Sequence, residues 1–133
     1  MPTRRKEHSG PGFEKGLAVR RAVLGEAYVD AALAGADDFT AEVQKLVTEY
    51  GWGEVWARPG LSRRERSLLN LGMLTALNRP EELRVHVRGA INNGLSPEEI
   101  KEALLQTAIY CGLPACLDAF RVARAVLAEM GKL

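Results

Sequence analysis

In the first half of the chain, hydrophobic residues recur at the three- and four-residue spacing of amphipathic helices. Few runs of β-branched residues interrupt this pattern, and glycine and aspartate residues punctuate it. The spacing predicts three helices, over residues 13–25, 26–35 and 39–50. Asp37 or Asp38 can cap the start of the third helix. The apolar stripe of that helix consists of Phe39, Val43, Leu46 and Val47. We expect residues 51–60, which contain both tryptophans, to form a linker.

The second half of the chain carries clearer start and stop signals for helices. Ser62 and Ser96 each precede a glutamate by three residues, a spacing at which the two residues cap a helix start reciprocally. The segment 68–77 is apolar nearly all round, which predicts a buried central helix. Further starts and ends are marked by Pro80, Pro97, Pro114, Gly94 and Gly131. These patterns predict an all-α fold of six to seven helices in a single domain over residues 13–133, behind a mobile tail over residues 1–12.

Charge and composition exclude several classes of function. The 133-residue chain balances 18 lysines and arginines against 17 aspartates and glutamates, so its net charge favours neither nucleic acid nor an anionic membrane as a partner. No apolar run reaches the roughly 18 residues of a membrane span and no secretion signal follows Met1, so we expect a cytoplasmic protein. Cys111 and Cys116 have neither redox-pair nor zinc-site spacing, and we expect buried, reduced thiols.

His86 is the main candidate for chemistry. The sequence lacks motifs for nucleotide binding, zinc proteolysis, the serine hydrolase elbow and calcium, and it has too few histidines and cysteines to suggest a metal site. On a helix, Glu82 lies one turn before His86 and Asn93 lies two turns after it, so the three side chains share a face. Glu82 could hold one ring nitrogen and leave the other for proton transfer. The alternative is that His86 belongs to a surface pair or is a satisfied group in the core.

Two arginines and two tryptophans are candidates for binding a substrate. Arg66 opens the predicted central helix and Arg58 lies in the predicted linker, where a guanidinium beside apolar surface needs an anionic partner. That partner is either a bound ligand or a structural carboxylate such as Glu54. Trp52 and Trp56 either cover the core or roof a pocket.

Three patterns occur in order along the chain and together carry a resemblance to a known family. They are W-x-RPGL-x-R-x-x-RSL from Trp56, ELR-x-HVR-x-A-x-NNG from Glu82, and LLQTAIYCG-x-PA from Leu104. With these patterns the chain resembles the 4-carboxymuconolactone decarboxylase family over nearly all residues past 13. It is also similar to the wider superfamily that includes alkylhydroperoxidase D. The resemblance implies an all-helical fold and assembly as a homotrimer or homohexamer, with sites near subunit interfaces.

The resemblance also implies a reaction without a cofactor, the decarboxylation of 4-carboxymuconolactone to the enol-lactone of 3-oxoadipate in protocatechuate catabolism. The substrate supplies its own electron sink, because the electrons released with carbon dioxide move into the lactone carbonyl. By this resemblance His86 would be the acid, oriented by Glu82, and Arg58 and Arg66 would bind the anionic groups. Asn93 or a tryptophan indole would donate a hydrogen bond to the lactone oxygen.

The chain departs from the family pattern at several positions. The paired cysteines that the peroxidase branch carries before its histidine are missing, so no peroxidatic thiol is expected. Gly89, Cys116 and Leu117 replace residues familiar in the decarboxylase branch, and Tyr28 stands where a histidine is familiar, which leaves the exact lactone open. The alternatives are a related lactone decarboxylase or isomerase, a peroxidase relative without the cysteine pair, and a non-catalytic helical oligomer.

Overall fold

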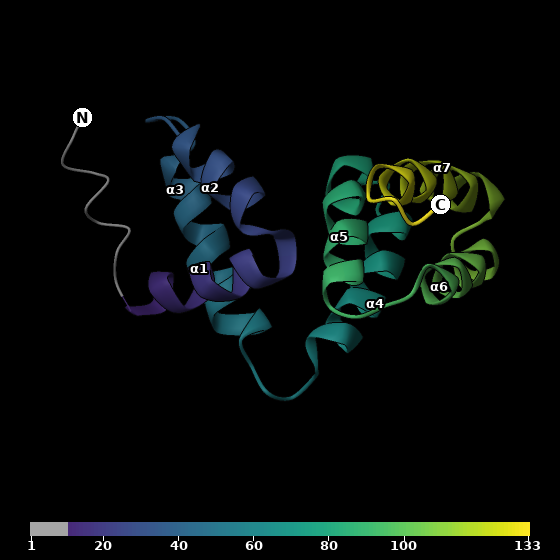
Figure 1. Ribbon diagram of the computed structural model, residues 1–133, viewed down its shortest axis with the longest axis horizontal. Coiled ribbons are helices and arrows are strands. Elements are labelled where there is room, and N and C mark those ends of the chain that lie inside the picture. Colours follow the sequence, from purple (N-terminus) through teal and green to yellow (C-terminus); the bar gives the residue numbers. More distant parts are fainter. Residues whose placement is uncertain (1–10) are drawn as a thin grey trace. The chain divides into compact units, whose positions relative to one another are not determined.

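The computed structural model describes residues 11–133, which form helices joined by short connections (Figure 1). No strand occurs among these residues. In chain order the helices are α1 (Pro11–Leu24), α2 (Glu26–Ala34), α3 (Ala41–Leu46), η2 (Val47–Trp56), α4 (Arg63–Ala76), α5 (Pro80–Asn92), α6 (Pro97–Tyr110) and α7 (Leu113–Glu129). The predicted all-α fold is therefore confirmed. The tail predicted for residues 1–12 falls outside the described residues except for its last two positions, which begin α1.

The described chain divides into two compact units, which adjoin in the sequence at Leu61 and Ser62. The first unit contains the helices from α1 to η2, and the second contains those from α4 to α7. Each unit has buried residues of its own, and each is described by itself below. The expectation of one domain over residues 13–133 stays a prediction.

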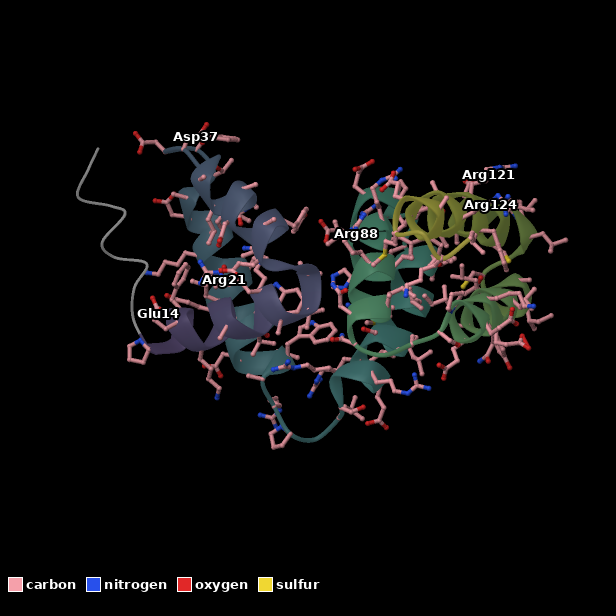
Figure 2. The ribbon with its side chains drawn as sticks, in the orientation of Figure 1. Glu14, Arg21, Asp37, Arg88, Arg121 and Arg124 are labelled. Atoms are coloured by element: carbon pink, nitrogen blue, oxygen red, sulfur yellow. The ribbon has the colours of Figure 1, made fainter. Side chains whose placement is uncertain are left out.

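Gly25 separates α1 from α2, where the sequence predicts a break. Its φ of 95° lies in the left-handed region, which glycine enters without steric cost. Arg21, labelled in Figure 2, joins the two helices across this break. It donates from Nε and Nη2 to one carboxylate oxygen of Asp30, at 2.9 and 2.7 Å. The turn is thus fixed both by its backbone conformation and by an ion pair.

The linker predicted for residues 51–60 is wrong over most of its length. Helix α3 continues without a break into η2, a wider helix of π type. Of the glycines in this segment, Gly53 is a packing contact, and it faces Gly16 of α1. A β-carbon on Gly53 would lie 2.7 Å from the carbonyl oxygen of Gly12, and one on Gly16 would collide with the carbonyl oxygen of Thr48. Without side chains at these two positions, α1 and η2 approach each other backbone to backbone.

Polar side chains join α1 to α3 and η2 inside the first unit. Arg20 is only 5% exposed. Its guanidinium donates to the side-chain oxygens of Gln44, at 3.0 Å, and Thr48, at 3.2 Å. Thr48 in turn donates to the backbone oxygen of Gln44 at 2.7 Å. Oxygens of the neighbouring helices therefore supply partners that a buried guanidinium requires.

The apolar stripe predicted for residues 39–50 is exposed in the described chain. Its members Phe39, Val43, Leu46 and Val47 are exposed to 93%, 51%, 61% and 38%. The buried residues of η2 are Thr48, Trp52 and Gly53, and the missing side chain of Gly53 allows the close approach of α1. The helical spacing of these residues is confirmed over residues 41–50, but their side chains do not face the core of this unit.

The helix cap predicted at Asp37 or Asp38 is not formed, because α3 begins after Thr40, whose side chain makes no capping bond. Asp37 closes the turn before that helix instead. Its carboxylate accepts hydrogen bonds from the backbone N–H groups of Phe39 and Thr40, both at 3.0 Å. The Thr40 hydroxyl donates to the same oxygen, and together these bonds lower the pKa of Asp37 below its usual value. The carboxylate therefore closes the turn that leads into α3.

Helices α4 to α7 enclose one apolar core in the second unit. Each helix contributes at least one side chain with 0% exposure: Leu71, Val87, Leu104 and Val126. The prediction of a buried helix over residues 68–77 is wrong for the described chain, since Leu69, Met73 and Leu77 are exposed to 53%, 44% and 60%. Within the described chain only the side of α4 that carries Leu71 is covered.

Both predicted capping boxes are present in the second unit. The Ser62 hydroxyl accepts from the backbone N–H of Glu65, at 3.1 Å, and the Glu65 carboxylate accepts from that of Ser62, at 2.8 Å. Ser96 and Glu99 form the same pair of bonds, at 3.1 and 3.0 Å. Glu99 also forms an ion pair with Arg64, which ties the start of α6 to the start of α4.

The two cysteines are free thiols, as predicted. Cys116 is buried in α7, and its sulfur lies 3.2 Å from the backbone oxygen of Leu104, to which the thiol donates. Cys111 follows the end of α6 and is only half-buried. The prediction of burial therefore applies fully to Cys116 alone.

Candidate functional site

His86 lies in the middle of α5 and is 8% exposed. The helix presents Leu83 and Val87 to the core of the second unit, and both are almost completely buried. On the same helix, Arg88, which is labelled in Figure 2, forms an ion pair with Glu129 of α7 at 3.3 Å. This pair and the core contacts fix α5, and they therefore fix the position from which the imidazole projects.

A side chain of α4 contacts the imidazole ring. The amide nitrogen of Asn70 lies 3.2 Å from Nδ1 of His86. Asn70 is half-buried. The next residue on the helix, Leu71, is fully buried. The packing of α4 on α5 thus brings together two polar groups that are sixteen residues apart in the sequence.

Burial lowers the pKa of His86 from its ordinary value of 6.5 to about 4. The cause is the loss of hydration, which disfavours the charged ring. At pH 7 only about one ring in a thousand would then carry a second proton. In the absence of a bound anion, His86 is therefore a neutral imidazole.

The predicted contact between Glu82 and His86 is not formed. Glu82 is exposed, and it takes part in no hydrogen bond or ion pair with another residue of the range 11–133. Hydration explains this outcome, because moving the carboxylate onto a buried ring would remove it from water. Asn70 replaces Glu82 as the neighbour of Nδ1.

Asn93 forms a second polar contact between α5 and α4. Its amide nitrogen donates to the hydroxyl of Ser67, at 2.8 Å, and to the backbone oxygen of Arg63, at 3.3 Å. An amide nitrogen has two hydrogens, and both are directed at α4 by these contacts. The predicted role of Asn93 as a donor to a substrate is untested, and it would require one of these bonds to be exchanged.

Sequence reasoning missed Ser67 and Asn70 as members of this polar cluster. Both are polar residues in a mostly apolar segment of α4, and they are three positions apart, which places them on one side of the helix. That spacing was the available signal. The spacing does not show which helix these two side chains face. The structure shows that they face α5 and the residue after it.

The predicted substrate-binding residues are divided between the two units. Arg66 lies on α4, one turn before Asn70, and is half-buried. Arg58 follows η2 in the first unit and is exposed. The carboxylate proposed as its structural partner, Glu54, is exposed and forms no ion pair with any residue from 11 to 133. Anion binding by Arg58 and Arg66 stays a prediction.

The two tryptophans stack on each other in the first unit. Their ring centroids are 4.8 Å apart and their planes are tilted by 30°. Trp52 is 4% exposed, and Trp56 is half-buried. Trp52 therefore covers buried surface of its own unit, which is the first of the two predicted alternatives. A role of Trp56 beside a ligand stays a prediction.

The chemistry available in the second unit is that of a neutral imidazole, two amides and a guanidinium. These are groups that donate hydrogen bonds to oxygen atoms and stabilise developing negative charge. In the range 11–133 no cluster of three or more histidine, cysteine, aspartate or glutamate side chains has a geometry suited to a metal ion. Within the same range no helix is both long and apolar enough to span a bilayer.

Comparisons with known proteins point in one direction. A model of the carboxymuconolactone decarboxylase family matches residues 41–125. A nitrosuccinic acid decarboxylase from Metarhizium robertsii is 48% identical over 118 residues, which cover 89% of this chain and 82% of that protein. A 4-carboxymuconolactone decarboxylase from Acinetobacter baylyi is 43% identical over 119 residues, which cover 90% of this chain and 89% of that protein. The matched segments include His86 and the polar cluster around it.

Proposed function

This chain belongs to the carboxymuconolactone decarboxylase family, and we propose that it converts 4-carboxymuconolactone to the enol-lactone of 3-oxoadipate without a cofactor. The observation that carries the proposal is the 43% identity to a 4-carboxymuconolactone decarboxylase over 90% of this chain. The relatives named as decarboxylases support the coarser statement that the protein is a decarboxylase.

The reaction suits a site built from hydrogen-bond donors. When the carboxylate leaves as carbon dioxide, the electron pair of the broken carbon–carbon bond moves through the ring double bond into the lactone carbonyl. The protein must bind the acetate arm, stabilise the resulting oxyanion and keep water away from the departing carboxylate. A water molecule or another acid then supplies the proton that a ring carbon of the product gains.

In this proposal Arg58 and Arg66 bind the anionic groups of the substrate, and His86 acts at the oxyanion. Guanidinium groups suit carboxylates because they donate two parallel hydrogen bonds. The near-complete burial of His86 supports its role, since donors work best where water is excluded. Asn93 or the Trp56 indole would donate to the lactone oxygen.

A second candidate substrate is nitrosuccinate, which the 48% identical relative decarboxylates according to its name. Loss of the carboxylate beside a nitro group places the electron pair on the nitro oxygens, so this substrate also supplies its own electron sink. Both reactions need the same elements: a bound dianion, a developing oxyanion and a dry cavity. Gly89, Cys116 and Leu117 are the departures that favour testing both substrates.

We also propose that the active particle is a homotrimer or homohexamer with sites near its subunit interfaces. Large apolar side chains stay exposed on the single described chain, among them Phe39, Ile109, Tyr110 and Leu113, at 93%, 79%, 81% and 65%. Exposed apolar surface of this extent is typical of association surfaces.

The experiment is a direct assay of both substrates. Purified full-length protein is incubated with enzymatically prepared 4-carboxymuconolactone or with nitrosuccinate, and ultraviolet absorbance and carbon dioxide release are followed. Turnover of the lactone supports the first proposal, and turnover of nitrosuccinate alone replaces it with the second. Absence of turnover with both substrates at high enzyme concentration overturns both.

The matched variant in this assay is His86→Gln. For an enzyme, this variant keeps its fold and particle size and loses turnover by about 100-fold or more. For a non-catalytic helical oligomer, the substitution would change neither particle size nor any activity. Circular dichroism and sedimentation of the variant check the fold and the particle.

A further inference from the structure

We propose that Asn70 is a positioning residue that holds His86 in the tautomer with its proton on Nε2, so that the neutral ring acts as a hydrogen-bond donor from Nε2. The inference deepens the proposed function and rests on it for the identity of the acceptor, the oxyanion formed by decarboxylation. The tautomer itself follows from contacts within the second unit.

The direction of one hydrogen bond sets the tautomer. The group 3.2 Å from Nδ1 is the amide nitrogen of Asn70, which can donate but cannot accept. Nδ1 must therefore offer its lone pair. In a neutral imidazole the single proton then resides on the other ring nitrogen, Nε2.

The position of Asn70 is fixed by its surroundings on α4. The next residue, Leu71, is fully buried in the core, which fixes the rotation of the helix at this point. Three residues earlier, the Ser67 hydroxyl accepts a hydrogen bond from Asn93 of α5 at 2.8 Å. The two helices are thus joined by two polar contacts, and the amide of Asn70 is held where it faces the imidazole.

A contact with Glu82 would favour the charged, doubly protonated ring. A carboxylate only accepts hydrogen bonds, so it would draw the proton to the ring nitrogen that it faces and stabilise a charged imidazolium. Asn70 has neither effect, because its amide nitrogen is a neutral donor. With Asn70 at Nδ1, in place of a carboxylate at one ring nitrogen, His86 is therefore a neutral hydrogen-bond donor and not a proton donor.

This role fits the energetics of a buried ring. Burial penalises the imidazolium, as the lowered pKa of His86 indicates, but it leaves the neutral N–H group able to donate. A neutral imidazole that donates to a developing oxyanion is an established solution in other enzymes. During decarboxylation the proton stays on Nε2, and the electron pair of the broken bond reaches an oxygen that accepts this hydrogen bond.

Nitrogen NMR of the full-length protein tests the tautomer without any substrate. The side-chain ¹⁵N resonances of His86 are assigned by comparison with His86→Gln, which leaves only His8. We expect the resonance of Nδ1 at the position of an unprotonated ring nitrogen and that of Nε2 at the position of a protonated one, at pH 7. A protonated Nδ1 in the unaltered protein overturns the proposal.

The variant Asn70→Asp tests whether Asn70 is the cause. Its carboxylate accepts instead of donating, so Nδ1 gains a proton, and turnover falls on the order of 100-fold. The control Asn78→Asp makes the same change of charge on an exposed side chain just after α4 and leaves both readouts unchanged. An unaltered tautomer in a folded Asn70→Asp protein contradicts the proposal.

A second variant covers the case in which Asn70→Asp does not fold. In Asn70→Leu the Nδ1 resonance moves toward that of a ring without a hydrogen bond, while an unchanged resonance contradicts the proposal. A protein that shows the expected tautomer but turns over neither substrate would defeat the proposed function and leave the tautomer assignment standing. The two failures are thus distinguishable.

Discussion

At the scale of a single residue, burial decides the chemistry that His86 can perform. The ring is 8% exposed and burial lowers its pKa to about 4, so at pH 7 it is neutral before an anionic substrate binds. The polar contact that orients it comes from the amide of Asn70. These two facts favour the neutral donor that we propose over the acid expected from the sequence.

The lowered pKa predicts a pH dependence of stability. Between pH 6.5 and 4 the unfolded chain binds a proton on His86 that the folded chain excludes, so this contribution to stability is complete above pH 6.5 and is lost as the pH falls toward 4. The loss amounts to about 3 kcal/mol in the unfolding free energy. Urea unfolding of the native protein and His86→Gln at several pH values measures it. Parallel stability curves for the two proteins would contradict it.

The sequence indicated His86 but not its partner. Along one helix, pattern reasoning offers only neighbours three or four positions away, and it therefore selected Glu82. The actual neighbour, Asn70, is sixteen residues away on another helix. Contacts of this kind depend on how two packed helices are rotated about their axes. Hydrophobic spacing indicates which face of each helix is buried, but it does not specify which polar side chains meet. The candidate site was thus predictable as a location and not as a set of contacts.

At the scale of elements, the contact between α1 and η2 shows glycine acting as a packing residue. Gly16 and Gly53 each face backbone atoms of the opposite helix at a distance that no β-carbon tolerates. Pattern reasoning treats glycines near a predicted helix end as breaks, and for Gly25 and Gly94, with φ of 95° and 96°, that rule is correct. For Gly53 it failed because the determining contact comes from α1.

Replacing Gly16 with alanine is expected to destabilise the first unit. The added β-carbon collides with the carbonyl oxygen of Thr48, so the helices must separate, at a cost of about 1 to 3 kcal/mol. Gly12 in the same helix is the matched control, because a β-carbon there meets nothing within 4 Å. Gly12→Ala should be neutral or stabilising by up to about 1 kcal/mol. Thermal unfolding of both variants measures the difference, and equal effects would refute the packing role.

The capping box at the start of α6 is expected to contribute about 1 kcal/mol to stability. Ser96→Ala removes the acceptor for the backbone N–H of Glu99. Glu99→Gln serves as a control, since it keeps an oxygen for the N–H of Ser96 and removes the charge paired with Arg64. That ion pair is partly exposed and is worth less than about 1 kcal/mol. In urea unfolding we therefore expect the larger loss for Ser96→Ala, and the reverse order would contradict the assignment.

At the scale of the whole molecule, the described chain leaves much apolar surface uncovered. Leu69 and Met73 on α4 and Leu77 just after it are exposed, as are Phe39 and Leu46 in the first unit. The sequence predicted helices for these segments correctly. It could not specify what their outer faces contact, because spacing distinguishes an apolar face from a polar one and does not identify its partner.

The exposed surface predicts a particle several times heavier than the 14.5 kDa chain. Sedimentation equilibrium should give a mass of three or six chains. Ile109 on α6 is 79% exposed, and the variant Ile109→Glu tests whether this helix takes part in the contact between chains. A charge inside an apolar interface costs several kcal/mol, so the variant should shift the particle toward single chains. A monomeric native protein would contradict the prediction.

Because the two cysteines are buried to different extents, the native protein has one preferred residue for attaching a thiol-reactive label, Cys111. Maleimide reagents need an accessible sulfur, and of the two residues only Cys111, half-buried in the described chain between α6 and α7, is not enclosed, whereas Cys116 is buried and its thiol donates to the backbone oxygen of Leu104. One spin label per chain would then sit at equivalent places in a symmetric ring. The number of distinct inter-label distances follows from the symmetry of that ring, so electron spin resonance could tell three chains from six without any engineered cysteine.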